Sequence, residues 1–134
     1  MAAAPCAEAP SLGDIQALAE RTRAALPAPF AALAQEVRLV VSDWPEDAVL
    51  DELRIEDAYD LTGLYDGTAL TERSTDRPEP PSTVYLYRRP ILDEWADRGD
   101  VTLTELVAHV TIHEFAHHFG WSDDDIAAID RWWE

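Results

Sequence analysis

Hydrophobic positions at helical spacing predict a helix near the start of the chain. Ser11 and Asp14 form a possible capping box, in which each side chain accepts a hydrogen bond from the other residue's backbone N–H. Apolar residues then recur at helical spacing until Pro27, which is expected to stop the helix. A short helical piece is expected at 29–35.

A longer helix is predicted at 102–119. Thr102 and Glu105 form a second possible capping box, and the apolar positions that follow continue without glycine or proline as far as Gly120. A glycine in this place is typical of the residue that ends a helix. A final short helix is expected at 123–133.

Several stretches have the composition of β-strands. Residues 37–41 are rich in β-branched side chains and predict a central strand. Residues 61–65 and 68–70 flank the turn dipeptide Asp66-Gly67 and predict a hairpin-like pair of short strands. Residues 83–88 predict a further strand. The remaining expected elements are a short helix within 46–60, a loop at 71–81 and a short helix after Pro90.

The length of the chain predicts one domain. At 134 residues it is long enough to bury a real hydrophobic core, and no internal repeat or second domain is visible. We expect residues 1–10 to form a flexible N-terminal tail and residues 11–134 to form the domain.

The candidate metal-binding and catalytic side chains are concentrated in the predicted helix at 102–119. All four histidines fall between positions 109 and 118, and the run from His113 to His117 has the form H-E-x-x-H. Residues four apart lie above one another on a helix, so the two rings can converge on one metal ion. Glu114 lies one residue further round, where a carboxylate can accept a proton from water without binding the metal. The motif predicts metal-dependent hydrolysis.

A zinc ion that keeps one position open for water needs a third protein ligand. Asp123 follows the motif closely and is our candidate. An alternative is structural, because Ser122 and Asp125 form another possible capping box and Asp123 and Asp124 in the first turn favour the helix dipole. Asp124, Asp125 and Asp130 are the other candidates for the third ligand.

The other two histidines are expected to have supporting roles. His109 lies about 12 Å from His117 along the helix axis, too far for both rings to bind one ion. We expect it to contact the ligands or the core. His118 points about 100° away from His117 and is expected to pack, to cap the helix end or to balance its dipole.

Charge and cysteine content exclude several classes of partner, cross-link and metal site. The formal net charge is −17, which argues against nucleic acid and against an anionic membrane surface. Cys6 is the only cysteine, so the chain forms no internal disulfide and holds no metal through a cysteine cluster. No segment is long and apolar enough to cross a membrane, and the first residues do not have the form of a signal peptide. We expect a cytoplasmic protein.

The chain resembles the minimal zincin family of small bacterial metallopeptidases over residues 36–130. The resemblance is carried by GLYDGTALTERS at 63–74, VYLYRRP at 84–90 and HEFAHHFG at 113–120. It implies an α+β fold, in which a small mixed sheet packs against the metal-bearing helix and further helices lie near both ends. It also implies that His113, His117 and Asp123 bind Zn²⁺ and that Glu114 activates water. Met1 is the only methionine, so the methionine turn of metzincins is absent.

The predicted function is zinc-dependent hydrolysis of a peptide or protein substrate. In zincins the substrate lies extended along an edge strand, and we expect residues 83–88 to offer that edge. Tyr85, Tyr87, Arg88 and Arg89 could steady an oxyanion or a substrate carboxylate; for the tyrosines the alternative is ordinary packing on the sheet. The alternative function is a metal-binding or protein-interaction module with weak or no catalytic activity.

Overall fold

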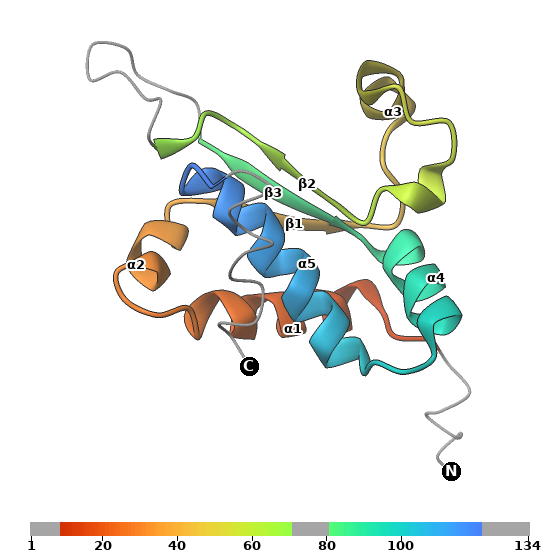
Figure 1. Ribbon diagram of the computed structural model, residues 1–134, viewed down its shortest axis with the longest axis horizontal. Coiled ribbons are helices and arrows are strands. Elements are labelled where there is room, and N and C mark those ends of the chain that lie inside the picture. Colours follow the sequence, from red (N-terminus) through yellow and green to blue (C-terminus); the bar gives the residue numbers. More distant parts are fainter. Residues whose placement is uncertain (1–8, 71–80, 122–134) are drawn as a thin grey trace.

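The computed structural model describes residues 9–70 and 81–121, which contain both helices and strands (Figure 1). In chain order the elements are α1 (Leu12–Ala24), α2 (Phe30–Ala34), β1 (Arg38–Ser42), α3 (Asp47–Leu53), the 3-10 helix η2 (Ala58–Asp60), β2 (Gly63–Asp66), β3 (Thr83–Tyr87), α4 (Arg88–Arg98) and α5 (Leu103–His118). The α+β fold predicted from the sequence is confirmed. The final helix expected at 123–133 lies outside the described residues.

Both predicted capping boxes are present. The Ser11 hydroxyl accepts a hydrogen bond from the Asp14 backbone N–H, and the Asp14 carboxylate accepts one from the Ser11 N–H. Thr102 and Glu105 make the same reciprocal pair at the start of α5. Because each box satisfies backbone donors that a helix leaves unpaired, these short motifs determine where the two longest helices begin.

The three strands form one mixed sheet in the order β1-β3-β2. β1 pairs with β3 in parallel, and β2 pairs with β3 antiparallel. The expectation that 37–41 forms the central strand is wrong, because β3 takes that place. Val84 and Leu86 of β3 are fully buried, whereas no residue of β1 is. Burial between two neighbouring strands and a covering helix favours the more continuously apolar strand.

The predicted hairpin at 61–70 is also wrong. β2 forms, but residues 68–70 form no strand, and β2 pairs with β3 instead. The backbone carbonyl of Thr68 accepts a hydrogen bond from the Tyr65 hydroxyl at 3.1 Å. The Tyr65 side chain therefore satisfies a backbone carbonyl that a second hairpin strand would have used in pairing.

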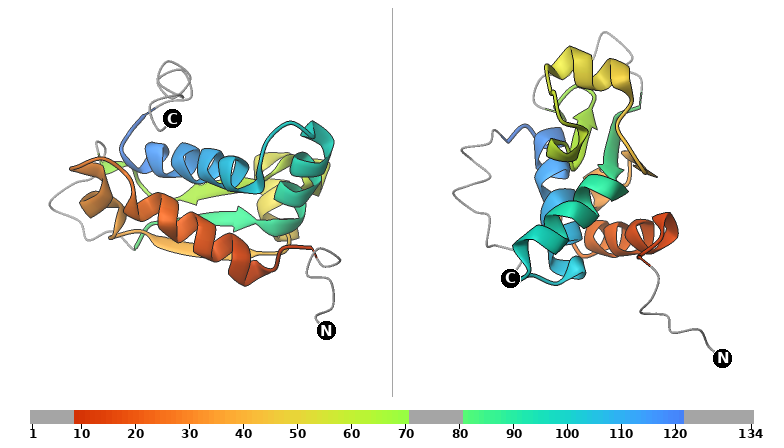
Figure 2. Two further views of the ribbon diagram at one scale, coloured as in Figure 1. Left: turned by 90° about the horizontal axis from the view of Figure 1, so that it is seen from below. Right: turned by 90° about the vertical axis from the view of Figure 1, so that its right-hand side faces the viewer.

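The core lies between one face of the sheet and the helices α1 and α5. The right-hand view of Figure 2 shows α1 on one side of the sheet and α3 on the other, and α5 packs beside α1 against the sheet. The fully buried apolar side chains of the core come from helices and strands alike: Ile15, Ala19, Ala34, Val84, Leu86, Ile91, Val107 and Phe115. Each larger one contributes roughly 1.5–3 kcal/mol by leaving water.

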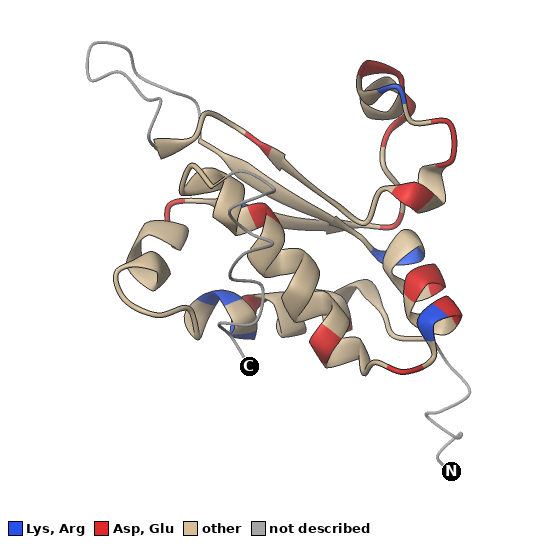
Figure 3. Ribbon diagram, in the orientation of Figure 1, with Lys and Arg blue, Asp and Glu red and all other residues tan. Residues whose placement is uncertain are grey.

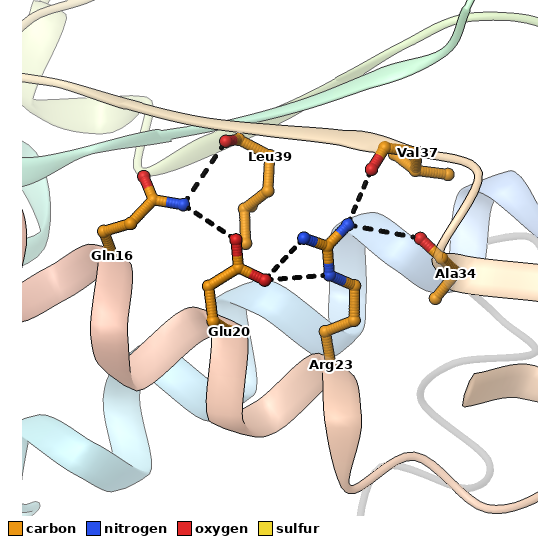
Figure 4. Close-up of polar contacts among 6 residues, drawn as sticks. All are labelled: Gln16, Glu20, Arg23, Ala34, Val37 and Leu39. Atoms are coloured by element: carbon orange, nitrogen blue, oxygen red, sulfur yellow. Dashed lines mark hydrogen bonds and ion pairs between the residues drawn. The ribbon is translucent and has the colours of Figure 1, made fainter. Parts of the chain in front are cut away.

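A polar cluster fixes α1 to β1 (Figure 4). The Arg23 guanidinium donates to the Val37 carbonyl at 2.6 Å and to the Ala34 carbonyl at 3.3 Å, while Glu20 binds its other side. Arg23 also lies 5.8 Å from the centre of the Phe115 ring. A single side chain thus contacts α1, the end of α2, the residue before β1 and the C-terminal part of α5.

No described helix is long and apolar enough to cross a membrane.

Candidate metal centre

α5 presents the two histidines of the H-E-x-x-H motif side by side. His113 and His117 are both half-buried, and their ring centres are 5.1 Å apart with the planes at 75°. The spacing follows from the helix, because four residues advance about 6 Å along the axis and return to nearly the same face. The expected juxtaposition of the two rings is present.

This geometry fits one zinc ion. Two imidazole rings bound through nitrogen to a tetrahedral Zn²⁺ at about 2.1 Å have ring centres roughly 5 Å apart. The ring centres of His113 and His117 are separated by this distance, and their steep mutual tilt keeps the rings from stacking on each other. The pair suits a shared metal better than a stacked aromatic contact.

The end of α5 orients His117. Nδ1 of His117 lies 3.2 Å from the backbone carbonyl oxygen of Trp121. Since a carbonyl only accepts hydrogen bonds, Nδ1 carries the proton and Nε2 is left with a lone pair. A metal-binding histidine commonly donates its second nitrogen in this way, so that its ring is held in one orientation.

The Trp121 carbonyl is placed by a Schellman motif at the end of the helix. Gly120 has φ of 90°, its N–H donates to the His117 carbonyl, and the Trp121 N–H donates to the Ala116 carbonyl. This is the pattern that closes a helix with a left-handed glycine. Gly120 therefore ends α5, as its position in the sequence predicts, and it also turns the chain back over His117.

Aromatic contacts hold this turn against α2. The ring centre of Phe30 lies 4.9 Å from that of Phe119 and 5.5 Å from that of Trp121. Aromatic pairs at these separations are attractive beyond the apolar area that they bury. Through them, α2 supports the carbonyl that orients His117.

Glu114 lies over the strand β2. A Cβ atom built on Gly63 would be 3.1 Å from Cγ of Glu114 and 2.9 Å from Cγ1 of Val110. Only a residue without a side chain permits α5 to pack this closely on β2. The Glu114 side chain therefore lies directly against the start of β2.

The remaining histidines have the supporting positions expected of them. The ring centre of His109 lies 6.4 Å from that of His113, one turn earlier on the same stripe of α5. His118 is fully buried, and its Nδ1 lies 2.7 Å from the Tyr65 hydroxyl. The prediction that His118 packs is confirmed, and its contact joins α5 to β2.

The candidates for a third ligand lie outside the described residues. Asp123, Asp124, Asp125 and Asp130 all follow residue 121, so their placement stays a prediction. Within residues 9–70 and 81–121, no group of three histidine, cysteine or acidic side chains is arranged to hold a metal. The described part of the centre supplies the two histidines.

The expectation that 83–88 forms the edge for a substrate is wrong. β3 pairs on both sides, whereas β2 pairs only with β3 among the described strands. Tyr85 and Tyr87 alternate with the core residue Leu86, which lies opposite Gly63. Both tyrosines therefore point to the sheet face away from α5, and the packing interpretation holds for them.

The Arg88 side chain, directly after β3, is engaged in structural contacts, whereas a role for the Arg89 side chain stays a prediction. Arg88 donates to the Pro10 carbonyl and pairs with Asp43 at 3.0 Å. Arg89 donates its backbone N–H to the Asp43 carbonyl. These contacts fix the segment before α1 and the end of β1 to the start of α4.

Several supporting residues could not be singled out from the sequence. Gly63 and Tyr65 belong to the motif at 63–74, but nothing local indicates which helix they contact. The contact of Trp121 with His117 is made by a backbone carbonyl, so the identity of the side chain at this position does not indicate it. Phe30 is an apolar residue in a short helix, and its contact with Phe119 depends on the tertiary fold.

A scan against models of protein families matches residues 34–133 to the family described as zincin-like metallopeptidase. The match covers most of the chain and includes β1 to α5, the part that forms the sheet and carries the histidine pair. No curated protein matches the chain.

Proposed function

Because the chain belongs to the family of zincin-like metallopeptidases, we propose that it is a zinc-dependent peptidase in which Glu114 is the general base. The observation that carries the proposal is the pair of ring centres 5.1 Å apart on α5. In this proposal His113 and His117 hold the metal, and Asp123 is the third ligand. A peptide or protein is the substrate class that the family implies.

Held by His113, His117 and Asp123, a zinc ion would supply Lewis-acid activation of a water molecule and of the peptide carbonyl. Glu114 accepts the proton of the attacking water, and its carboxyl group then donates that proton to the leaving amine. The packing of its side chain on Gly63 supports this role, since it places Glu114 beside the strand where a substrate would run. The carbonyl of Trp121 keeps His117 in the orientation for binding.

We place the substrate along the edge of β2 that pairs with no described strand. An extended peptide that pairs with Gly63–Asp66 would add a strand to the sheet and lie along α5. Its backbone would then be held by hydrogen bonds that do not depend on side-chain identity. The packing of α5 on β2 supports this placement, because it brings Glu114 to the same edge.

The proposal is tested by measuring peptide hydrolysis and zinc content together. Glu114→Gln is expected to lower hydrolysis by about 10²–10⁴-fold, because the amide accepts no proton, while zinc content per chain stays near that of the wild type. His113→Ala and Asp123→Ala are expected to lose both zinc and activity.

His109→Ala is the matched control, since it removes an imidazole from the same stripe of α5 but leaves every proposed ligand in place. It is expected to retain zinc. Equal zinc loss in His109→Ala and His113→Ala would contradict the ligand assignment. Hydrolysis at the native rate in Glu114→Gln would contradict the mechanism. A protein that binds zinc but cleaves no peptide would favour the alternative of a metal-binding or interaction module.

A further inference from the structure

The sheet has a second face that the core does not use. α1 and α5 cover one face, while α3 lies on the other side and has no buried residue of its own (Figure 2). Between α3 and the sheet is a cavity of about 240 Å³. Small-molecule sites typically measure roughly 300–1,000 Å³, so this cavity suits a single long side chain better than a cofactor.

Aromatic rings and carboxylates line this cavity together. Its aromatic members are Trp44, Tyr85 and Tyr87, and its acids are Glu46 and Asp66. The rings of Tyr85 and Tyr87 are parallel within 3°, with centres 6.3 Å apart. Trp44 keeps 41% of its surface exposed at the rim, where an indole is normally covered. Tyr87 is buried and the Trp44 ring also contacts that of Tyr59, with centres 4.9 Å apart, so the aromatic surface left for a ligand comes from Trp44 and the half-buried Tyr85.

The negative charge of the cavity is not compensated by the rest of the described chain. Neither Glu46 nor Asp66 forms an ion pair with any residue in the ranges 9–70 and 81–121. The nearby Arg88 is paired with Asp43. Figure 3 shows further acidic residues along α3 and the segment that follows it. Burial, with additional effects from Tyr85, Glu46, Glu114 and Asp66, raises the pKa of Tyr87 to about 12, which agrees with a negative local potential.

We propose that this cavity binds the arginine side chain of a peptide, with the guanidinium against Trp44 and Tyr85 and paired with Glu46 and Asp66. A cation is attracted both to the faces of aromatic rings and to carboxylates. A planar guanidinium stacks on such rings and pairs with a carboxylate through two hydrogen bonds, which an ammonium group does not do. None of the residues that line the cavity is a proposed metal ligand or the proposed general base, so arginine binding there does not require the proposed peptidase activity.

The test is calorimetric titration of the whole protein with three tripeptides, acetyl-Gly-X-Gly-amide, in which X is arginine, lysine or citrulline. Citrulline has nearly the shape of arginine but no charge. The arginine peptide is expected to bind with a Kd on the order of 1 mM, the lysine peptide more weakly and the citrulline peptide at least about tenfold more weakly. Citrulline binding as tight as arginine, or lysine binding tighter, would overturn the proposal.

Two double variants locate the site. Glu46→Gln with Asp66→Asn is expected to weaken binding of the arginine peptide by about tenfold, whereas Asp51→Asn with Glu52→Gln, which makes the same change in net charge on the exposed part of α3, leaves it within about twofold. Trp44→Leu is expected to weaken binding by about threefold. Equal losses in the two double variants, or an unchanged affinity in Trp44→Leu, would show that the cavity is not the site.

Discussion

Gly63 shows how one missing side chain sets the position of the proposed general base. Its backbone lies under Val110 and Glu114, closer than any side chain would permit. Val110 is β-branched and buried, so it has little freedom to move. The placement of Glu114 beside the edge strand therefore depends on a residue that has no chemistry of its own.

Gly63→Ala is expected to destabilise the fold by about 1–3 kcal/mol, because the added methyl overlaps Val110 and overpacks the interface between α5 and β2. Hydrolysis should fall as well, because Glu114 is displaced. Chemical unfolding and the peptidase assay measure the two effects. Gly13→Ala is the control: its new Cβ would meet only Ser11 Oγ at 3.7 Å, and it is expected to stabilise α1 by about 0.5 kcal/mol. A neutral Gly63→Ala would show that α5 does not need this close approach.

Tyr87 is expected to make the protein less stable as the pH becomes alkaline. Burial raises its pKa from 10.0 to about 12, with smaller contributions from Tyr85 and nearby acids. The folded state therefore keeps the phenol proton where the unfolded state has lost it, and stability falls as pH rises from 10 to 12. Unfolding midpoints in urea across this range are expected to fall less steeply in Tyr87→Phe. The exposed Tyr59→Phe should follow the wild type, and identical slopes in all three proteins would contradict the assignment.

At the scale of elements, the end of α5 joins helix termination to metal binding. Gly120 closes the helix, and the same turn brings the Trp121 carbonyl to His117. α2 supports the turn through Phe30. The backbone turn that ends α5 therefore also orients His117, a proposed metal ligand.

Gly120→Ala is expected to lower stability by about 1–2 kcal/mol, because alanine is strained at positive φ, and also to weaken zinc binding, because the turn that orients His117 is disturbed. Gly99→Ala is a matched control, since Gly99 ends α4 with φ of 71° and has nothing within 4 Å of an added Cβ. It should cost similar stability with zinc affinity unchanged. Competition with a metal chelator measures that affinity. Equal weakening of zinc binding in both variants would show that the turn at Gly120 has no specific effect on the metal centre.

At the scale of the whole molecule, the dominant feature is the net charge of −17. The chain has 27 acidic residues and only 10 lysines and arginines, so most of the acids have no basic side chain to pair with. Some of the basic residues are also used within single helices, where Arg23 pairs with Glu20 and Arg98 with Glu94. The mutual repulsion of the acids therefore opposes the compact state.

Salt is expected to stabilise the protein by screening this repulsion. Raising NaCl from about 20 mM to about 500 mM at neutral pH should raise Tm by about 5 °C. Near pH 5, where part of the carboxylates are protonated, the rise should be smaller. Differential scanning calorimetry gives both values. A Tm that does not change with salt at neutral pH would mean that the acids are too far apart for repulsion to matter.

The sequence by itself determined the features that depend on neighbours along the chain. Capping boxes, the glycine that ends α5 and the spacing of His113 and His117 are all local, because helical hydrogen bonds and side-chain stripes connect residues three or four apart. The helix that carries the histidine pair, and the chemistry expected of it, could therefore be predicted from the order of the residues alone.

Only the tertiary structure decided the order of the strands and the surroundings of the histidine pair. β3 lies between β1 and β2 and carries the fully buried Val84 and Leu86, and Gly63 lets α5 pack closely on the edge strand β2. The contacts of His117 with Trp121, of Phe30 with Phe119 and of His118 with Tyr65 also follow from packing. Strand pairing and packing join residues far apart in sequence, and their free energy depends on which surfaces are buried together, which no local pattern encodes.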